Sequence, residues 1–210
     1  MTGGSGRGTV PAVLLDRLPA VPVAAGRRSF VVGLDGRSGS GKSTLAAAVA
    51  TRLGGPAVVT VIEGDDFYRG GSARTWDRRS APESVDRVTD WRAQRSVLTR
   101  LRAGGAASWH AFDWDDERWD DDRAPVATTA TTARAAPVVV LEGAYACRPE
   151  LHDLLDLRVL LTAPGDVRRR RLATRDGDDH DPVWEARWAA AETHYLDGVM
   201  PPERFDVVLG

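Results

Sequence analysis

Short apolar runs alternate with runs of helical periodicity along most of the chain. Five apolar runs have the near-continuous character of strands that are buried on both faces of a sheet. They lie at 30–35, 57–62, 137–141, 157–162 and 205–209. Apolar residues at helical spacing in the other stretches predict helices. These lie at 10–18, 43–53, 91–102, 149–155, 166–175 and 182–196. The alternation predicts an α/β domain with a five-stranded, mostly parallel sheet.

The remaining stretches carry weaker patterns. Residues 67–89 are polar and rich in arginine, and they are predicted to be irregular. Residues 106–114 favour a short strand or an extended arm, and an acidic stretch follows at 115–123. The Ala/Thr tract at 127–136 is typical of a variable surface loop or a hairpin. The glycine-rich residues 1–8 are predicted to be disordered.

Composition narrows the class of protein. The chain has 210 residues and a net charge of −2, so its overall charge gives no support to a nucleic-acid-binding role. The single cysteine, Cys147, excludes an intramolecular disulfide and is interpreted as a packing residue in a reducing compartment. No basic stretch followed by an apolar core stands at the start, and no apolar run reaches membrane-spanning length. We therefore expect a cytoplasmic protein with neither a membrane nor a nucleic acid as partner.

A phosphate-binding loop follows the first predicted strand. Residues 36–43 match the eight-position pattern of such loops, with Gly36 first, Gly41 sixth, Lys42 seventh and Ser43 eighth. Glycines allow backbone angles at which successive N–H groups converge on a polyphosphate, and the following helix adds its positive N-terminal end. The lysine can reach the β- and γ-phosphates, and the serine hydroxyl can bind Mg²⁺. A plain glycine-rich turn is the alternative, but strand, spacing and helix together favour nucleotide binding. The loop residues predicted to contact the nucleotide are Gly36, Ser38, Gly39, Ser40, Gly41, Lys42, Ser43 and Thr44.

Acidic residues follow two other predicted strands. Asp65 and Asp66 come after the second strand, and Glu142 comes after the third. Because the carboxyl ends of parallel strands meet at one edge of a sheet, Asp65 and Glu142 are expected to lie near the phosphate loop. Glu142 resembles the acid that ends a Walker-B strand and is predicted to bind Mg²⁺, while Asp65 is predicted to accept a hydroxyl proton or bind the metal. A helix N-cap or a turn is the alternative for the aspartates, and the role of Asp66 stays open.

The helix predicted at 166–175 carries arginines on one face. Arg168, Arg171 and Arg175 are spaced three and four positions apart and therefore share that face. In a lid helix that closes over a polyphosphate, Arg168 would contact the nucleotide, while Arg171 and Arg175 would stabilise charge at the transferred group. The alternative is a solvated basic face that pairs with the acidic run at 176–181.

Aromatic and acidic residues are interleaved at 109–119. A segment of this kind can stack on a polar organic substrate, or its tryptophans can pack on the domain as part of a surface flap. Pattern and period favour neither, and both interpretations stay open.

Four segments together resemble the uridine kinase and phosphoribulokinase-like family of P-loop kinases. They are the phosphate loop at 36–44, Glu-Gly-Asp-Asp-Phe-Tyr at 63–68, Leu-Glu-Gly at 141–143 and the arginine-rich stretch at 166–176. The similarity runs from residue 30 to residue 209, and Asp-Asp-Phe-Tyr at this distance from the loop is its most specific part.

The resemblance implies a three-layer P-loop NTPase fold with an arginine lid helix and a small substrate flap. The flap is expected at about 104–136 and the lid at about 165–182. Both belong to a single kinase domain at 27–210, behind a flexible segment and short helix at 1–26.

The resemblance also implies ATP and Mg²⁺ as cofactors and a small-molecule hydroxyl as phosphoryl acceptor. In the family, the Asp of the Asp-x-Phe-Tyr segment takes the acceptor proton, which points to Asp65. The residues expected at the acceptor site are Tyr68, Asp86, Phe112, Trp114, Arg148, Glu192 and Tyr195. For the acid that binds the ribose, Asp90 is an alternative to Asp86. Residues 111–114 stand where uridine kinases carry a Tyr and a His, so uridine and cytidine are candidate acceptors only. The resemblance leaves open whether the donor is ATP or GTP, and, since relatives often pair, whether the protein is a homodimer.

A function of a different class is a nucleotide-binding switch that hydrolyses ATP weakly and regulates a protein partner. Such a protein needs segments that order on the γ-phosphate and a side chain that positions the attacking water. No motif of that kind stands out in the sequence, which favours the kinase.

Overall fold

The computed structural model describes residues 9–19, 28–116, 124–177 and 181–210. Several predictions from the sequence lie outside these residues. They concern the disordered segment 1–8, the domain boundary near residue 26, most of the acidic stretch 115–123, and residues 178–180 at the end of the lid.

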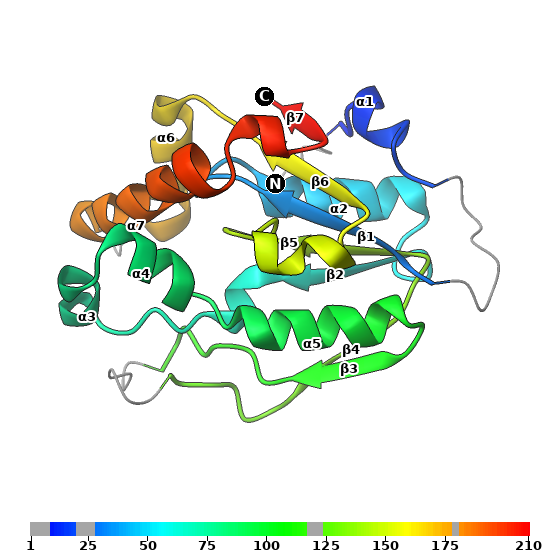
Figure 1. Ribbon diagram of the computed structural model, residues 1–210, viewed down its shortest axis with the longest axis horizontal. Helices are drawn as coiled ribbons and strands as arrows, with labels where there is room; N and C mark the ends of the chain where they lie inside the picture. The colour runs from blue at the N-terminus through cyan, green and yellow to red at the C-terminus, as the bar shows by residue number, and fades with distance from the viewer. Residues whose placement is uncertain (1–8, 20–27, 117–123, 178–180) are drawn as a thin grey trace, which may run out of the picture.

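Five parallel strands form the central sheet, in the order β2-β5-β1-β6-β7 (Figure 1). They are β1 (Phe30–Asp35), β2 (Val59–Glu63), β5 (Val138–Glu142), β6 (Leu157–Leu161) and β7 (Val207–Leu209). Every neighbouring pair of strands in this sheet is parallel. The predicted α/β fold with a five-stranded sheet is therefore confirmed, and the strand ends differ from the expected ones by no more than two residues.

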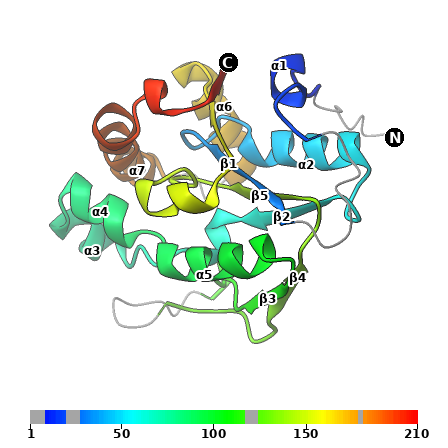
Figure 2. The ribbon, with the colours of Figure 1, turned by 45° about the vertical axis from the view of Figure 1, so that its right-hand side comes forward.

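Helices cover both faces of the sheet, which gives three layers (Figures 1 and 2). On one face, Val138 and Val140 of β5 share a core with α2 (Lys42–Leu53) and with α1 (Ala12–Leu15). On the other face, the alternate residues of β5 pack against α5 (Trp91–Arg102). Because both faces are covered, the strands are apolar without interruption, which explains why the sequence pattern located them.

A small antiparallel hairpin lies beside α5, at the edge of the molecule (Figure 1). It consists of β3 (Ala106–Trp109) and β4 (Thr131–Arg134), so the Ala/Thr tract forms a hairpin strand in part. Its attachment is specific, because the Trp109 indole N–H donates to Asp66 Oδ2 at 2.7 Å and the Thr60 hydroxyl donates to the Arg134 carbonyl at 2.7 Å. Asp66, whose role the sequence left open, thus holds the hairpin against the end of β2.

The prediction that residues 67–89 are irregular is wrong. The stretch contains helices α3 (Ala73–Arg78) and α4 (Ala81–Arg87), after a 3₁₀ turn, η1 (Gly64–Phe67). Serine caps start both helices, and Ser80 forms a capping box with Glu83. Few apolar side chains are needed to anchor such short helices, which is why no periodic pattern marks them. The predicted helix at 10–18 is also shorter than expected, since α1 spans only Ala12–Leu15.

Between β5 and β7 the described residues form five helical segments. They are η2 (Pro149–Leu154), α6 (Gly165–Asp176), α7 (Pro182–His194), a π-helical turn, η4 (Tyr195–Val199), and η5 (Pro202–Arg204). Cys147 is fully buried, and burial raises the pKa of its thiol well above the usual value, which agrees with a packing role. None of the helices in the described parts of the chain combines the length and the apolar character that a membrane span requires.

Candidate active site

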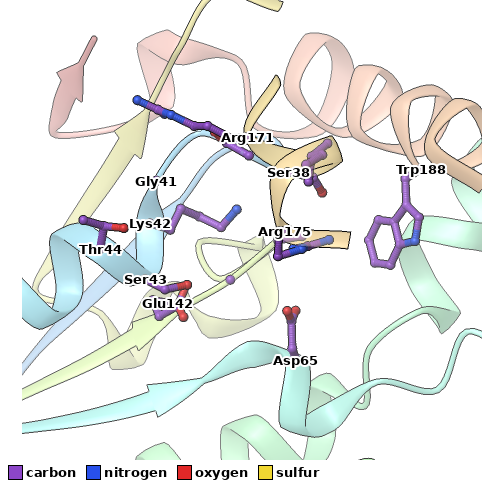
Figure 3. A pocket seen from close by; sticks show the side chains of 14 residues that line it. Ser38, Gly41, Lys42, Ser43, Thr44, Asp65, Glu142, Arg171, Arg175 and Trp188 are labelled. Atoms are coloured by element: carbon purple, nitrogen blue, oxygen red, sulfur yellow. The ribbon is translucent and has the colours of Figure 1, made fainter. Parts of the chain in front are cut away.

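A cavity of about 440 Å³ lies at the carboxyl ends of β1, β2 and β5 (Figure 3). Its walls come from the phosphate loop, the turn after β2, the end of β5, the lid helix α6 and the aromatic helix α7. The lining residues are Ser38, Gly39, Gly41, Lys42, Ser43, Thr44, Asp65, Glu142, Gly143, Ala144, Arg171, Leu172, Arg175 and Trp188. The structure thus brings most of the predicted loop, metal and lid residues to one place, from segments that lie far apart in the sequence.

The phosphate loop has the backbone that its glycines allow. Gly36, Gly39 and Gly41 have φ angles of 144°, 74° and 105°, which side-chain-bearing residues rarely adopt. At Gly39 a β-carbon would also lie 2.7 Å from the Arg168 carbonyl oxygen. Glycine therefore permits both the turn and the close approach of the lid helix to the loop.

Lys42 lies over its own loop. Its Nζ donates to the carbonyl oxygens of Gly36 at 2.8 Å and Arg37 at 3.2 Å, and Figure 3 shows the side chain extending into the cavity. The ammonium group therefore supplies positive charge at the wall where a polyphosphate would enter.

Ser43 and Glu142 place two side chains with oxygen atoms that can ligate a metal at the base of the cavity. Burial raises the pKa of the Glu142 carboxyl, and the hydrogen bond with the Ser43 side chain and the charge of Lys42 act in the opposite direction. The neighbouring carboxylates of Asp65 and Glu63 raise the pKa of Glu142 further. A buried acid with acidic neighbours is costly to ionise without a cation, so this group suits a metal.

These oxygen atoms fit Mg²⁺, which proteins commonly hold through one or two carboxylates together with substrate phosphates and water. Within the described residues, no group of three or more His, Cys, Asp or Glu side chains could hold a metal ion without such help. Ser43 and Glu142 are the residues that would hold the ion, with Asp65 across the cavity from them (Figure 3).

Asp65 reaches the cavity because two glycines let the turn after β2 approach the end of β5. A β-carbon at Gly64 would lie 2.8 Å from the Glu142 carbonyl oxygen, and one at Gly143 would lie 3.0 Å from the Gly64 α-carbon. Gly143 also has a φ of 150°. The close contact of these backbones fixes the position from which the Asp65 carboxylate faces the loop (Figure 3).

The lid arginines share one face of α6, and that face is turned toward the phosphate loop. Arg168 donates to the Ser38 carbonyl at 3.2 Å, and Arg171 donates to the Gly39 and Ser40 carbonyls at 3.1 and 2.9 Å. Arg175 lines the cavity and forms an ion pair with Asp176. The hydrogen bond with Asp176 and the negative charges of Asp176 and Asp65 raise the pKa of the Arg175 guanidinium. The helix therefore lies close to the loop and presents two arginines to the cavity.

The seven residues expected at the acceptor site do not share one environment, and none is among the described residues that line the cavity. Tyr68, Phe112 and Trp114 form an aromatic group with ring centroids 4.6 to 4.9 Å apart. Asp86 lies 3.8 Å from Arg148, whose guanidinium is buried and paired with Glu150 at 2.9 Å. These last contacts stabilise the packing of α4 against the rest of the domain.

The other two, Glu192 and Tyr195, contact the rear of the phosphate loop. Glu192 accepts hydrogen bonds from Ser38, and the Tyr195 hydroxyl donates to Asp35 Oδ2 at 2.8 Å. Asp35 is fully buried at the end of β1 and also accepts from the backbone N–H groups of Gly36 and Cys147. Burial raises the pKa of Asp35, against these hydrogen bonds. No local pattern singles out this aspartate, because its partners come together only in the fold.

Trp188 is the aromatic residue of the cavity, and sequence reasoning missed it. Its ring centroid lies 6.1 Å from that of Tyr68 and 5.2 Å from that of Trp76, so Trp188 packs against these two aromatic side chains while it lines the cavity. Trp188 precedes Glu192 by four positions and therefore lies on the same face of α7. The four-residue spacing between Trp188 and Glu192 is the feature of the sequence that could have indicated Trp188 as a site residue.

Comparisons with known proteins identify the family of this chain. Residues 32–189 match the family model described as the AAA domain. The chain is 30% identical over 189 residues to the uridine kinase of Deinococcus deserti, with 87% of each chain covered. Similar folds occur in a possible uridine kinase from Bacillus stearothermophilus, with a TM-score of 0.63, 24% identity and 94% of this chain and 100% of that one covered. The phosphoribulokinase from Rhodobacter spheroides has a TM-score of 0.56, 17% identity and coverages of 86% and 69%. At these identities the solved structures show the shared fold alone.

Fold, phosphate loop and family model together define a P-loop nucleotide-binding protein of the AAA-domain class. Within that class, the chain belongs to the uridine kinase-like family of P-loop kinases. It is an ATP-dependent small-molecule kinase, a phosphotransferase with an alcohol group as acceptor.

Proposed function

We propose that this kinase transfers the γ-phosphoryl group of ATP to a hydroxyl of a nucleoside-like or sugar-like acceptor, with Asp65 as the general base. The observation that carries the proposal is the position of the Asp65 carboxylate. It faces the phosphate loop across a cavity that also receives Arg171 and Arg175 of the lid. A carboxylate opposite a phosphate site is placed to take the proton of an acceptor bound between them.

Each residue then has one task in the reaction. The acceptor oxygen forms a bond to the γ-phosphorus while the bond to the β–γ bridging oxygen breaks, and ADP leaves with that oxygen. Asp65 takes the proton that the acceptor hydroxyl loses. Lys42, Arg171 and Arg175 stabilise the negative charge on the phosphoryl oxygens. Ser43 and Glu142 would hold Mg²⁺, which supplies further neutralisation of the phosphate charge when bound.

The acceptor side of the cavity supports a compound with a flat or weakly polar face. Trp188 lines the same cavity as Asp65 and supplies an aromatic surface there (Figure 3). Sugar rings and nucleobases pack well against such surfaces. Uridine and cytidine are the first acceptors to test, since the curated relative from Deinococcus deserti is a uridine kinase.

The experiment is a measurement of ADP release with a panel of acceptors, each supplied with ATP or GTP and Mg²⁺. We expect one acceptor class among nucleosides, sugars and sugar phosphates to stimulate ADP release, and mass spectrometry to detect the phosphorylated product. A matched reaction without Mg²⁺ serves as control. Release of ADP at one rate whether or not any acceptor is present, with stimulation only by added protein, would contradict the proposal.

Gly64→Ala offers a test of the geometry that places the base. The added methyl group would meet the Glu142 carbonyl oxygen at 2.8 Å, so the turn that carries Asp65 must move away from β5. We expect kcat to fall about tenfold or more, since small displacements of a base are costly, while ADP affinity stays near that of the wild type. Gly198→Ala serves as the control, because a β-carbon there meets nothing within 4 Å and neither Gly198 nor Gly64 has a positive φ. An unchanged kcat in Gly64→Ala would show that the close backbone contact is not required.

A further inference from the structure

Glu192 of α7 is a buried carboxylate in contact with the phosphate loop. Only 3% of the residue is exposed. Its Oε1 accepts two hydrogen bonds from Ser38, one from the backbone N–H at 2.7 Å and one from the hydroxyl at 2.7 Å. The carboxylate therefore binds the third residue of the loop by its backbone and its side chain together.

This arrangement is unusual in its electrostatics. A buried carboxylate loses hydration, and its negative charge stands beside a loop whose chemistry is to bind anions. Among the described residues, the cation at ion-pair distance is Arg37, whose Nη1 lies 4.0 Å from the other carboxylate oxygen. The two hydrogen bonds with Ser38 must therefore offset most of the hydration that the buried carboxylate loses. They are of the strong, charge-assisted kind. The contact thus fixes Ser38 firmly.

A second connection joins α7 to the same part of the loop. The Tyr195 hydroxyl, three positions after Glu192, donates to Asp35, which accepts from the Gly36 N–H at 2.7 Å. Two buried carboxylates therefore hold Gly36 and Ser38, on either side of Arg37, and both depend on α7 and the turn that follows it. Ser38 itself lines the cavity, as do most of the loop residues that follow it.

We propose that Glu192 is a positioning residue, which holds the first half of the phosphate loop in the conformation that binds nucleotide. Because α7 also carries Trp188 into the cavity, the helix connects the wall of the cavity to the geometry of the loop. Without the carboxylate, the cost of ordering the loop offsets part of the free energy of nucleotide binding, so the affinity for nucleotide falls. This inference requires only nucleotide binding at the loop and does not depend on the identity of the acceptor.

The test compares the Mg·ADP affinity of four variants with that of the wild type by isothermal titration calorimetry, alongside their melting temperatures. Glu192→Ala should raise the Kd of Mg·ADP about ten- to fiftyfold, because two charge-assisted hydrogen bonds are lost. Glu192→Gln keeps an oxygen that can accept from both Ser38 donors, so its Kd should stay within about threefold of the wild type. Ser38→Ala removes one donor and should have an intermediate effect. Thr193→Ala, on the same helix, removes only a contact with the Arg37 side chain and should bind like the wild type.

A double-mutant cycle of Glu192→Ala and Ser38→Ala separates positioning from general loss of stability. The two changes should be less than additive in Mg·ADP affinity, because both remove the same contact, whereas two independent losses of stability would add. Wild-type or tighter Mg·ADP binding by folded Glu192→Ala would overturn the proposal. Should that variant fail to fold, a loss of tenfold or more in Glu192→Gln, or none in Ser38→Ala, would overturn it instead. Since no acceptor is needed, these outcomes are independent of whether the acceptor panel identifies a substrate.

Discussion

Asp65→Asn is expected to lower the rate of phosphoryl transfer about 10²- to 10⁴-fold and to leave the affinity for Mg·ATP within about threefold of the wild type. Asparagine is nearly isosteric with aspartate but cannot take a proton from the acceptor hydroxyl. The loss should therefore appear in kcat, with little change in KM for ATP. Single-turnover measurements under saturating ATP and acceptor would isolate the chemical step.

The neighbouring acid provides a matched control for this experiment. Asp66 accepts from the Trp109 indole, and an asparagine at that position can still accept the same hydrogen bond through its amide oxygen. Asp66→Asn removes one negative charge at almost the same place and should retain most of the activity. Similar losses in the two variants would indicate that local charge, rather than a general base at Asp65, is responsible. Full activity of Asp65→Asn would exclude this residue as the base.

The donor side of the site could be predicted because its chemistry depends on local sequence. The loop at 36–43 is one continuous segment, Asp65 lies two residues after β2, and Glu142 is the last residue of β5. Once the strands are known to be parallel, their carboxyl ends must meet, so the positions of these residues follow from the fold class alone. The lid arginines could also be predicted from local sequence, because helical spacing determines which of them share a face.

The residues expected on the acceptor side could not be placed in this way, because their contacts are set by long-range packing. Tyr195 contacts Asp35 across 160 positions of sequence, and Glu192 contacts Ser38 across 154. Nothing in the local pattern of α7 distinguishes a side chain that faces an acceptor from one that faces the rear of the loop. The same limit explains why Trp188 was missed although the tryptophan-rich helix itself was predicted.

The two helices α3 and α4 illustrate a different limit. Their starts are marked by serine caps, and Ser80 with Glu83 forms a recognisable capping box. The signal was therefore present, but each helix is short and anchored by few apolar residues, so a search for periodicity passes over it.

Glu142→Gln is expected to reduce activity strongly, about 10²-fold or more, and to raise the Mg²⁺ concentration needed for half-maximal activity. The carboxylate is a buried oxygen donor beside Ser43, and the amide that replaces it carries no charge for the metal. Burial raises the pKa of Glu142, so in the free protein the proton is retained at a pH where an exposed glutamate would already have lost it. The wild-type kcat/KM for Mg·ATP should therefore decrease as the pH is lowered, with an apparent pKa above the ordinary value for glutamate. A higher Mg²⁺ concentration should move this decrease to lower pH.

Stability should respond in the opposite direction to activity. Because the pKa of Glu142 is higher in the folded than in the unfolded chain, ionisation of this group costs stability as the pH rises through the folded value. Glutamine removes that cost, so in the absence of nucleotide Glu142→Gln should melt no lower than the wild type at pH 8, although it is nearly inactive. Glu203→Gln is a suitable control, because Glu203 lies in η5, is exposed and does not line the cavity. A lower melting temperature for Glu142→Gln, or an unchanged requirement for Mg²⁺, would show that Glu142 supports the fold rather than the metal.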